Sequence, residues 1–350
     1  MFEVARKRRQ KRFALPRWTH PFAARHLMMR APQPGDRIGR YRIDSLVTQG
    51  GMASVFRGTD ERTGKSVAIK IPHPQYEMDV LFFDRFHREA NIGRKLDHPG
   101  VVKVLPAEDD GRVCMIMEWV EGRPLRNILD EEKKLSPERA ERIAIRICDA
   151  LGYIHDHGVV HRDLKPDNIM IDEHDQIKLI DFGIAGEARA RRLTFSKFTK
   201  AMGTPDYVSP EQVKGKRGDA RSDVYSLGVM LYEMLTGQVP FGGANPLTTL
   251  NQRLLSPPLP PREIDPSIAP QLQEIIFRAM ERDPANRYQT ARDFAHDLVN
   301  PEGVGIIERE EASHNGLVHA TGTKRAWHYV ALALIPIAIF ALLLLVAHSQ

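Results

Sequence analysis

The sequence predicts an α+β fold in which a small β-rich lobe is followed by a larger helical lobe. Short apolar runs separated by turn residues fill the first part of the globular region, and beyond about residue 120 apolar residues recur every three or four positions. The chain has 350 residues, of which 42% are hydrophobic and 27% charged, so it can bury a large core. This composition excludes collagen-like and wholly disordered chains.

The β-rich lobe is predicted from strand-like runs bounded by turn residues such as Thr63-Gly64. These runs lie at 41–47, 53–59, 66–71, 101–105 and 113–117. A helical pattern at 79–96 interrupts them. The cysteines, Cys114 and Cys148, are too few for a disulfide framework, which indicates a reducing, cytosolic environment.

Two long helices are predicted in the second lobe. The first begins at Ser136-Pro137, ends before Gly158, and has an apolar face made of Ile143, Ile147, Leu151 and Ile154. The second ends at Gly237 and has an apolar face made of Val224, Leu227, Leu231 and Leu235. Together with the strands, they define one globular domain over 41–299.

Residues 1–36 form a basic segment that we expect to be flexible. Residues 1–30 hold nine Lys or Arg against Glu3, a net +8, although the whole chain carries only +5. The segment is a solvated tail, a transit-like peptide, or an extension before a true start at Met28 or Met29. A further hypothesis places it on anionic lipid. Nucleic acid is not expected as a partner, although the same residues offer that competing use.

A polar linker at 300–325 precedes a predicted transmembrane helix at 328–347. Val330–Ala347 contains eighteen residues without a charge, about the minimum that crosses a bilayer. Leu342–Val346 is apolar on every face, which disfavours a core helix. Because Lys324 and Arg325 precede the span, we expect a single-pass protein of the cell (inner) membrane, with the domain in the cytoplasm and no ectodomain.

The densest motif is His-Arg-Asp-Leu-Lys-Pro-Asp-Asn at 161–168, followed by Asp-Phe-Gly at 181–183. Together they resemble the catalytic loop and metal-binding turn of the eukaryotic-like (Hanks-type) serine/threonine protein kinases, in their bacterial type. The resemblance implies the bilobal protein-kinase fold over 41–299, with a small β-rich N-lobe and a larger helical C-lobe. With the C-terminal transmembrane helix, it implies a membrane-anchored protein kinase.

Four residues of these motifs acquire roles from the resemblance, and the roles agree with the chemistry of phosphoryl transfer. Asp163 is expected to be the base that orients the attacking hydroxyl, and Lys165 to neutralise the transferring γ-phosphate. Asn168 and Asp181 supply oxygen ligands for Mg²⁺, with Mn²⁺ as an alternative. The implied phosphate donor is ATP.

The nucleotide site is expected in the N-lobe. Val-Ala-Ile-Lys at 67–70 places Lys70 on a strand, with Glu89 as its ion-pair partner. The phosphate-covering loop is expected from Thr48 to Val55, and it departs from the family pattern because Thr48 and Ala53 replace glycines, with Thr48 where the family's flexible turn begins. Its remaining glycines still let backbone N–H groups approach phosphate. The full set of expected nucleotide-binding residues is Thr48, Gln49, Gly50, Gly51, Val55, Ala68, Lys70, Glu89, Met117, Glu118 and Val120.

An activation segment of thirty-one residues is expected from Asp181 to Glu211, ending in Gly-Thr-Pro-Asp-Tyr-Val-Ser-Pro-Glu. In the family this segment selects protein substrates, and Thr204 is typical of serine/threonine specificity, its hydroxyl bridging the base and the lysine. Arg162 implies control by phosphorylation of this segment. Of the available acceptors, Thr199 is favoured over Thr194 and Ser196.

Two scaffold contacts are also implied: an ion pair between Glu211 and Arg287, and hydrogen bonds from the catalytic loop to Asp223. Transient homodimers are expected, because anchoring raises the effective concentration. The alternative function is a membrane-tethered nucleotide-binding pseudokinase scaffold, suggested by the altered glycine loop. A small-molecule phosphotransferase is disfavoured, because such enzymes lack a peptide-docking segment.

Overall fold

The computed structural model describes residues 32–77, 80–107, 113–181, 206–242 and 246–307. The chain divides into two units, 1–305 and 306–350, and the fold described below belongs to the first. Within the described ranges, no helix is both long and apolar enough to cross a membrane. The expected span at 328–347 lies outside them, so it stays a prediction.

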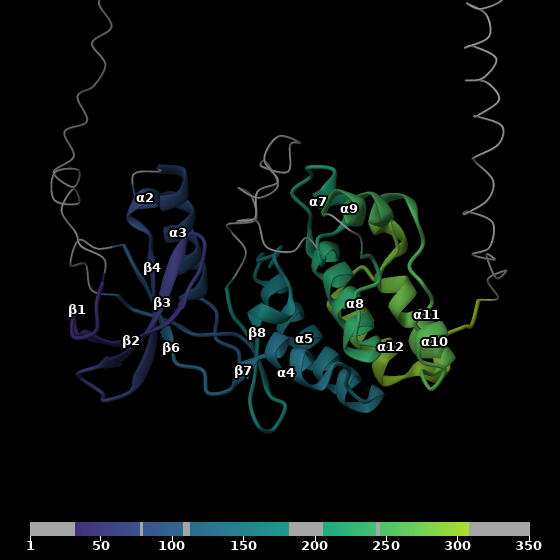
Figure 1. Ribbon diagram of the computed structural model, residues 1–350, viewed down its shortest axis with the longest axis horizontal. Helices are drawn as coiled ribbons and strands as arrows, with labels where there is room; N and C mark the ends of the chain where they lie inside the picture. Colours follow the sequence, from purple (N-terminus) through teal and green to yellow (C-terminus); the bar gives the residue numbers. More distant parts are fainter. Residues whose placement is uncertain (1–31, 78–79, 108–112, 182–205, 243–245, 308–350) are drawn as a thin grey trace, which may run out of the picture. The chain divides into compact units, whose positions relative to one another are not determined.

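The N-lobe is a six-stranded antiparallel sheet in the order β1-β2-β3-β4-β6-β5 (Figure 1). Its strands are β1 (Arg37–Ile38), β2 (Tyr41–Gln49), β3 (Ala53–Asp60), β4 (Ser66–Pro72), β5 (Val104–Leu105) and β6 (Met115–Glu118). The predicted run at 101–105 is mostly not strand, since Val101 makes only an isolated bridge to Leu179. Alternating residues of β2 and β4 are buried in a small core around Tyr41 and Ile69.

The helical interruption of the sheet begins and ends earlier than predicted. It consists of α2 (Pro74–Glu77) and α3 (Val80–Gly93), and the three residues after Gly93 donate backbone hydrogen bonds to the last turn of α3. Phe86 and Ala90 of α3 are buried in the main core, which fixes the face on which Glu89 also lies buried.

The C-lobe is helical, as predicted (Figure 1). Its helices are α4 (Leu125–Glu132), α5 (Pro137–Asp156), α7 (Pro210–Val213), α8 (Ala220–Thr236), α9 (Pro246–Leu255), α10 (Pro261–Ile264), α11 (Pro270–Ala279) and α12 (Ala291–Val299), with 3-10 turns η1 (Pro166–Asn168), η2 (Pro284–Asn286) and η3 (Pro301–Gly303). The two long predicted helices are confirmed. Ser136 caps α5 by accepting the Arg139 N–H, and α8 ends at Gly237, whose φ of 73° is left-handed.

A second, three-stranded antiparallel sheet carries the catalytic motifs and was not predicted. Its strands are β7 (Arg123–Pro124), β8 (Ile169–Ile171) and β9 (Ile177–Leu179). Gly122 leads into it with φ 129°, and a Cβ there would lie 2.4 Å from the Ile171 carbonyl oxygen, so only glycine fits. The catalytic loop precedes β8 and Asp181 follows β9, so one small sheet sets the distance between the two motifs.

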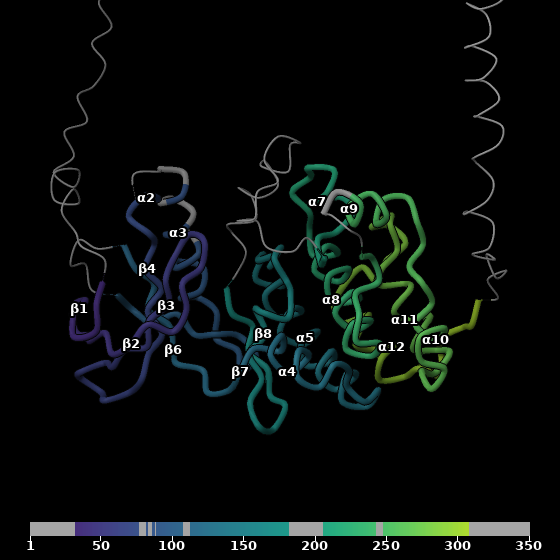
Figure 2. Tube along the Cα trace, viewed as in Figure 1, coloured from purple at the N-terminus to yellow at the C-terminus, as the bar shows by residue number. Residues whose placement is uncertain are grey.

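The main core joins the two lobes, between which the chain runs from β6 through β7 to α4 (Figure 2). Phe86 and Met117 of the N-lobe belong to the same buried cluster as Leu151 and Leu179 of the C-lobe. Backbone hydrogen bonds reinforce this join, because the Val102 N–H donates to the Leu179 oxygen at 3.0 Å and the Leu179 N–H donates to the Gly100 oxygen at 2.8 Å. The strand before Asp181 is therefore fixed to both lobes.

Candidate active site

Hydrogen bonds to one buried carboxylate, that of Asp223, hold the backbone of the catalytic loop. Asp223, fully buried in α8, accepts the backbone N–H groups of His161 and Arg162, each at 2.8 Å. His155 of α5 adds a third contact, with Nε2 2.8 Å from the same carboxylate. The expected scaffold contact is therefore present, and His155 is a partner that sequence reasoning missed. Charge-assisted hydrogen bonds of this kind are strong when buried, so the loop backbone is held firmly.

The side chains of the catalytic loop converge on Asp163. Lys165 Nζ lies 3.3 Å from Asp163 Oδ2. The Asn168 amide donates to the Asp163 backbone oxygen at 2.8 Å and to Oδ2 at 3.4 Å. Because both contacts use the amide nitrogen, the amide oxygen of Asn168 is the atom available to a metal. Asp163 keeps about a quarter of its side chain exposed, which leaves it open to an incoming hydroxyl.

Lys70 connects the N-lobe to Asp181. Its Nζ lies 2.6 Å from Asp181 Oδ1 and 3.9 Å from Glu89 Oε1, so β4, α3 and the end of β9 meet at one cation. Asp181 adopts a left-handed φ of 57°, uncommon for a residue other than glycine. Such conformations persist where the surroundings enforce them, here through the Lys70 contact and the short strand before it.

The electrostatics of this triad follow from burial and mutual attraction. Burial opposes the charge of Lys70, but the carboxylates of Asp181 and Glu89 outweigh it and raise the lysine pKa. Burial also disfavours ionised Asp181, yet Lys70 holds the pKa of this carboxyl below its usual range. Glu89 differs, because burial dominates over the more distant Lys70 and raises its pKa to about 7. Lys70 and Asp181 are thus firmly charged, while the charge of Glu89 is conditional.

The residues present fit a divalent cation of the magnesium type. The Asn168 amide oxygen and the Asp181 carboxylate are hard oxygen donors on adjacent segments, and Mg²⁺ is usually held by one or two such groups together with substrate phosphates. Among the described residues, no cluster of three or more His, Cys, Asp or Glu could hold a metal by itself.

The glycine loop begins later than the sequence pattern suggested. Thr48 does not open a flexible turn; it lies in β2 opposite Val55, where a β-branched residue is favourable. The chain reverses after Gln49, and the Gly50 N–H donates to the Ala53 oxygen at 2.9 Å. A Cβ on Gly50 would lie 3.2 Å from that oxygen, so a side chain would crowd the turn.

His73 restrains the far arm of this loop and was not anticipated. Its backbone N–H donates to the Met52 oxygen at 2.9 Å, and its ring Nε2 lies 3.1 Å from the Ser54 hydroxyl. Loop and histidine are joined only because β3 and β4 pair, with Ser54 opposite Ile71. No local sequence signal marks such a contact.

The hinge, the chain that follows β6 and is expected to give backbone hydrogen bonds to the nucleotide, also joins the two lobes. Met117 is buried opposite Ala68, and Val55 pairs with Lys70, so these residues share the β3–β4–β6 part of the sheet. The Glu118 carboxylate, however, accepts from Lys178 Nζ at 2.7 Å and from the Lys103 N–H at 3.0 Å. Its side chain therefore joins the lobes, which leaves only the main chain of Glu118 for a nucleotide. Val120 packs against the main core.

The end of the activation segment is anchored by buried polar groups. Arg126 donates to both oxygens of the Glu233 carboxylate, at 3.0 and 3.1 Å, and to the Tyr207 hydroxyl. Ser226 donates to the Tyr207 backbone oxygen at 2.7 Å. Thr204 and the acceptors Thr194, Ser196 and Thr199 lie outside the described residues, so their roles stay predictions.

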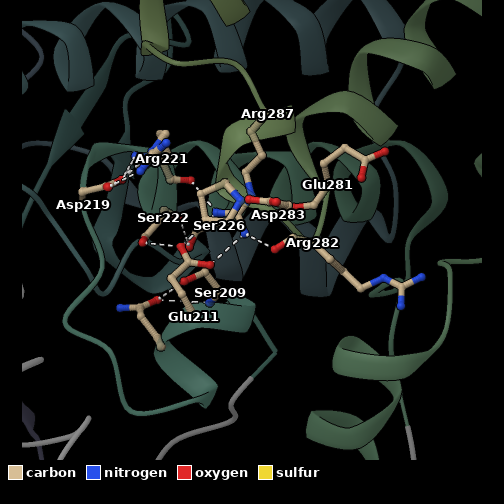
Figure 3. A network of polar contacts seen from close by, with 12 residues as sticks. Ser209, Glu211, Asp219, Arg221, Ser222, Ser226, Glu281, Arg282, Asp283 and Arg287 are labelled. Atoms are coloured by element: carbon tan, nitrogen blue, oxygen red, sulfur yellow. Dashed lines mark hydrogen bonds and ion pairs between the residues drawn. The ribbon is translucent and has the colours of Figure 1, made fainter.

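The expected ion pair below this segment is confirmed (Figure 3). Arg287 donates to both oxygens of Glu211, at 2.9 and 2.7 Å, and Ser222 donates to the same carboxylate at 2.6 Å. The Arg287 side chain is completely buried and also donates to the backbone oxygens of Glu281, Arg282 and Arg221. Removing either member of this buried ion pair would leave the other as an uncompensated buried charge. The loss of one partner is therefore expected to be strongly destabilising.

Comparison with known proteins agrees with this geometry. The model of the protein kinase domain matches residues 41–299, so the chain belongs to the protein kinase family. A probable serine/threonine-protein kinase of Streptomyces coelicolor is 39% identical over 265 residues, covering 74% of this chain and 39% of that protein. The probable serine/threonine-protein kinase PknB of Corynebacterium glutamicum is 37% identical over 289 residues, covering 80% of this chain and 44% of that protein. The chain thus spans about two fifths of the length of these bacterial relatives.

Solved structures show the same fold. Rad53 residues 1–466, crystallised in complex with AMP-PNP, aligns with a TM-score of 0.62 and 30% identity over 74% of this chain and 65% of that one. The PknI kinase domain of Mycobacterium tuberculosis aligns with a TM-score of 0.62 and 25% identity, covering 77% of this chain and all of that one. The bilobal fold is therefore that of a protein kinase.

Proposed function

We propose that the chain is a serine/threonine protein kinase that transfers the γ-phosphate of ATP to protein hydroxyl groups. The observation that carries the proposal is the convergence on Asp163, with Lys165 3.3 Å away and Asn168 bonded to it. Family membership, the names of the bacterial relatives and the AMP-PNP bound by Rad53 support the choice of ATP and of serine or threonine.

In the proposed reaction, the hydroxyl oxygen forms a bond to the γ-phosphorus while the bond to the ADP oxygen breaks. Asp163 accepts the hydroxyl proton, and Lys165 stabilises the charge that develops on the phosphoryl oxygens. Lys70 binds the nucleotide phosphates, and its contact with Asp181 orients that carboxylate. Asn168 and Asp181 would hold Mg²⁺, which would supply positive charge to neutralise the phosphates.

The alternative of a nucleotide-binding pseudokinase scaffold rests on the altered glycine loop. That loop nevertheless closes into a regular turn at Gly50, and Thr48 fits the strand in which it lies. The candidate base, both candidate metal ligands and Lys70 are all in place. These observations favour the active enzyme over the scaffold.

The test is the Asp163→Asn variant of the full-length protein, measured for phosphoryl transfer to a generic acceptor protein and for ATP binding. Loss of the base should lower kcat by about 10³-fold while ATP affinity changes little. Glu173→Gln is the matched control, because it removes a carboxylate whose side chain is 86% exposed in the β8–β9 turn. Unchanged turnover in Asp163→Asn would remove Asp163 as the base.

The proposal extends to location and regulation. A transmembrane helix at 328–347 would hold the kinase at the inner membrane with the domain in the cytoplasm, and the basic segment 1–36 would add contacts to anionic lipid. Autophosphorylation of the activation segment, at Thr199 ahead of Thr194 and Ser196, would occur between transiently paired copies. Comparing the full chain with a variant lacking 1–36 on anionic and neutral vesicles tests the lipid contact.

A further inference from the structure

A hollow of about 680 Å³, lined in part by Glu211, lies outside the catalytic site. Three segments line it: the chain from Glu211 to Asp219, the start of α8 at Arg221, and residues 282–284 before and within η2. Figure 3 shows five of the lining residues, Glu211, Asp219, Arg221, Arg282 and Asp283. None of the roles assigned above to the catalytic and nucleotide-binding residues uses it.

The acidic groups of the hollow are engaged within the protein. Both Glu211 oxygens are bound by Arg287, and both Asp219 oxygens are bound by Arg221, at 3.1 and 2.7 Å. The Asp283 carboxylate accepts the Ala285 N–H at 2.9 Å and so caps η2. Figure 3 shows the Glu211 and Asp219 carboxylates turned toward their arginines.

Three cations of the hollow, in contrast, have no carboxylate partner in the described part of the chain. Lys214 and Lys216 are exposed and form no ion pair there. Among the described residues, Arg282 donates only to the backbone oxygens of Leu254 and Leu255, at 3.4 and 3.2 Å, and these neutral acceptors do not neutralise its charge. After internal pairing, the lining keeps three positive charges against the single charge of Asp283.

The lysine-bearing segment is held in one shape. Gly215 and Gly218 have left-handed φ values of 77° and 74°, and the Lys216 N–H donates to the Glu211 oxygen at 3.0 Å. A Cβ on Gly218 would lie 2.4 Å from the Ser222 hydroxyl, so the segment presses directly against α8. Because the backbone that bears these lysines is already ordered, less conformational entropy is lost when the lysines bind an anion than if the segment were flexible.

The hollow is also close in structure to the catalytic loop. Gln212, in the same short helix α7 that follows Ser209, donates from Nε2 to the Arg162 backbone oxygen at 3.0 Å. Arg162 directly precedes the candidate base, and Glu211 is the last residue of the activation segment. One four-residue helix therefore joins the hollow to the place where a protein substrate is expected to lie.

We propose that this hollow binds an acidic or phosphorylated side chain of the protein substrate, at a distance along the substrate from the accepting hydroxyl. The proposal rests on the proposed kinase function and names its substrate class. Cations on separate segments around a concavity suit an entering carboxylate or phosphoryl group, which accepts several charge-assisted hydrogen bonds. A flat anionic bilayer would contact the rim alone, so a peptide is the better match.

The test uses the full-length protein and long synthetic peptides with one central threonine. Each flanking position in turn holds glutamate, phosphothreonine or glutamine. The pocket variant combines Lys214→Gln, Lys216→Gln and Arg282→Gln, and a second variant changes only the two lysines in case the arginine is needed for folding. The matched control combines Arg62→Gln, Lys65→Gln and Lys95→Gln, three exposed cations of the N-lobe. Anisotropy of labelled phosphothreonine peptides measures binding independently of turnover.

We expect a lower KM for peptides with an acidic residue at one or a few positions, and a rise of about tenfold in that KM in the pocket variant. Turnover of the glutamine peptides should be unchanged, and the control should behave as wild type. The proposal is overturned if the pocket variant keeps the acidic preference, if the control loses it equally, or if only binding to anionic vesicles falls. If no peptide is phosphorylated, the kinase assignment fails. If the affinities measured by anisotropy are equal for wild type and the pocket variant, the proposed binding site is overturned separately.

Discussion

The support of the catalytic loop and the support of the glycine loop differ sharply. Below the base, Asp223 accepts three contacts at 2.8 Å in a fully buried position, and Arg287 is buried with a bidentate partner. Around the nucleotide, the loop is exposed and held by the Gly50–Ala53 turn and by His73, and Glu89 lies 3.9 Å from Lys70. The catalytic loop is therefore held in position before a substrate binds, while the glycine loop can adjust its conformation around the nucleotide.

This difference predicts that mutations at the two loops change different measured constants. Changes below the catalytic loop should reduce stability and kcat, because they displace groups that act in the transition state. Changes around the glycine loop should raise the KM for ATP while leaving kcat nearly intact. Four variants test this expectation, in order of decreasing effect.

Arg287→Ala should lower the free energy of unfolding by about 4 kcal/mol, because it leaves the Glu211 carboxylate buried without its partner. Thermal and denaturant unfolding of the full-length protein measure the loss. Arg287→Lys keeps the charge but loses the bidentate contact, so an intermediate value is expected. If the alanine variant loses less than about 1 kcal/mol of unfolding free energy, the pair contributes no more than a surface ion pair does. That result would contradict its structural role.

Glu89→Gln should change how stability depends on pH. The Glu89 pKa is raised from the usual 4.5 to about 7, so between these pH values the native state binds more protons at this site than the unfolded state. Its contribution to stability is therefore complete below about pH 4.5 and is lost as pH rises through 7, with an amplitude up to about 3 kcal/mol. The difference in unfolding free energy between wild type and variant should fall across this window. A flat or rising difference refutes the assignment.

Asp223→Asn should cost about 2 kcal/mol of stability and lower kcat about tenfold, with the KM for ATP unchanged. The amide has one acceptor oxygen where the carboxylate offers two to the His161 and Arg162 N–H groups. Steady-state kinetics with varied ATP separate the two constants. A rise in KM without a fall in kcat would place the effect of Asp223 on the nucleotide side.

His73→Ala should raise the KM for ATP about fivefold, the worth of roughly one hydrogen bond, and leave kcat within about twofold. Ser54→Ala removes the other half of the same contact, so the double variant should be no worse than either single one. Additive effects would show that the two side chains act independently of each other.

How far the sequence predicts this molecule depends on whether a feature is local. The start of α5 at Ser136 and the end of α8 at Gly237 were predicted because these residues carry helix-capping signals, whereas α8 begins at Ala220, before the Asp223 at which its start was expected. Strands β7, β8 and β9 escaped prediction because two or three residues are too few to show a period. His73 and His155 could not be assigned, since their contacts arise only when distant segments pair. The motif predicts a backbone contact of Glu118 with the nucleotide, but it gives no sign that the Glu118 carboxylate is bound by Lys178, a partner sixty residues away.

In the candidate site, too, the residues marked by a local motif were predicted and the others were not. Motifs of the family predict one site that contains Asp163, Lys165, Asn168, Lys70 and Asp181, because each lies beside a short, recognisable run of sequence. The structure brings Lys165 and Asn168 to Asp163, and Lys70 to Asp181. The position of Thr48 was misjudged, since the loop pattern gives the order of residues but not where the strand ends. The hollow near Lys214 has no motif at all.

The most direct test of the account is the mass of the protein after incubation with MgATP. Full-length wild type and Asp163→Asn are incubated in parallel, and phosphorylated residues are then mapped. We predict that wild type gains one or more phosphoryl groups on threonine or serine residues and that the variant gains none. Absence of added mass in a wild-type protein that binds ATP would contradict the account and favour the scaffold.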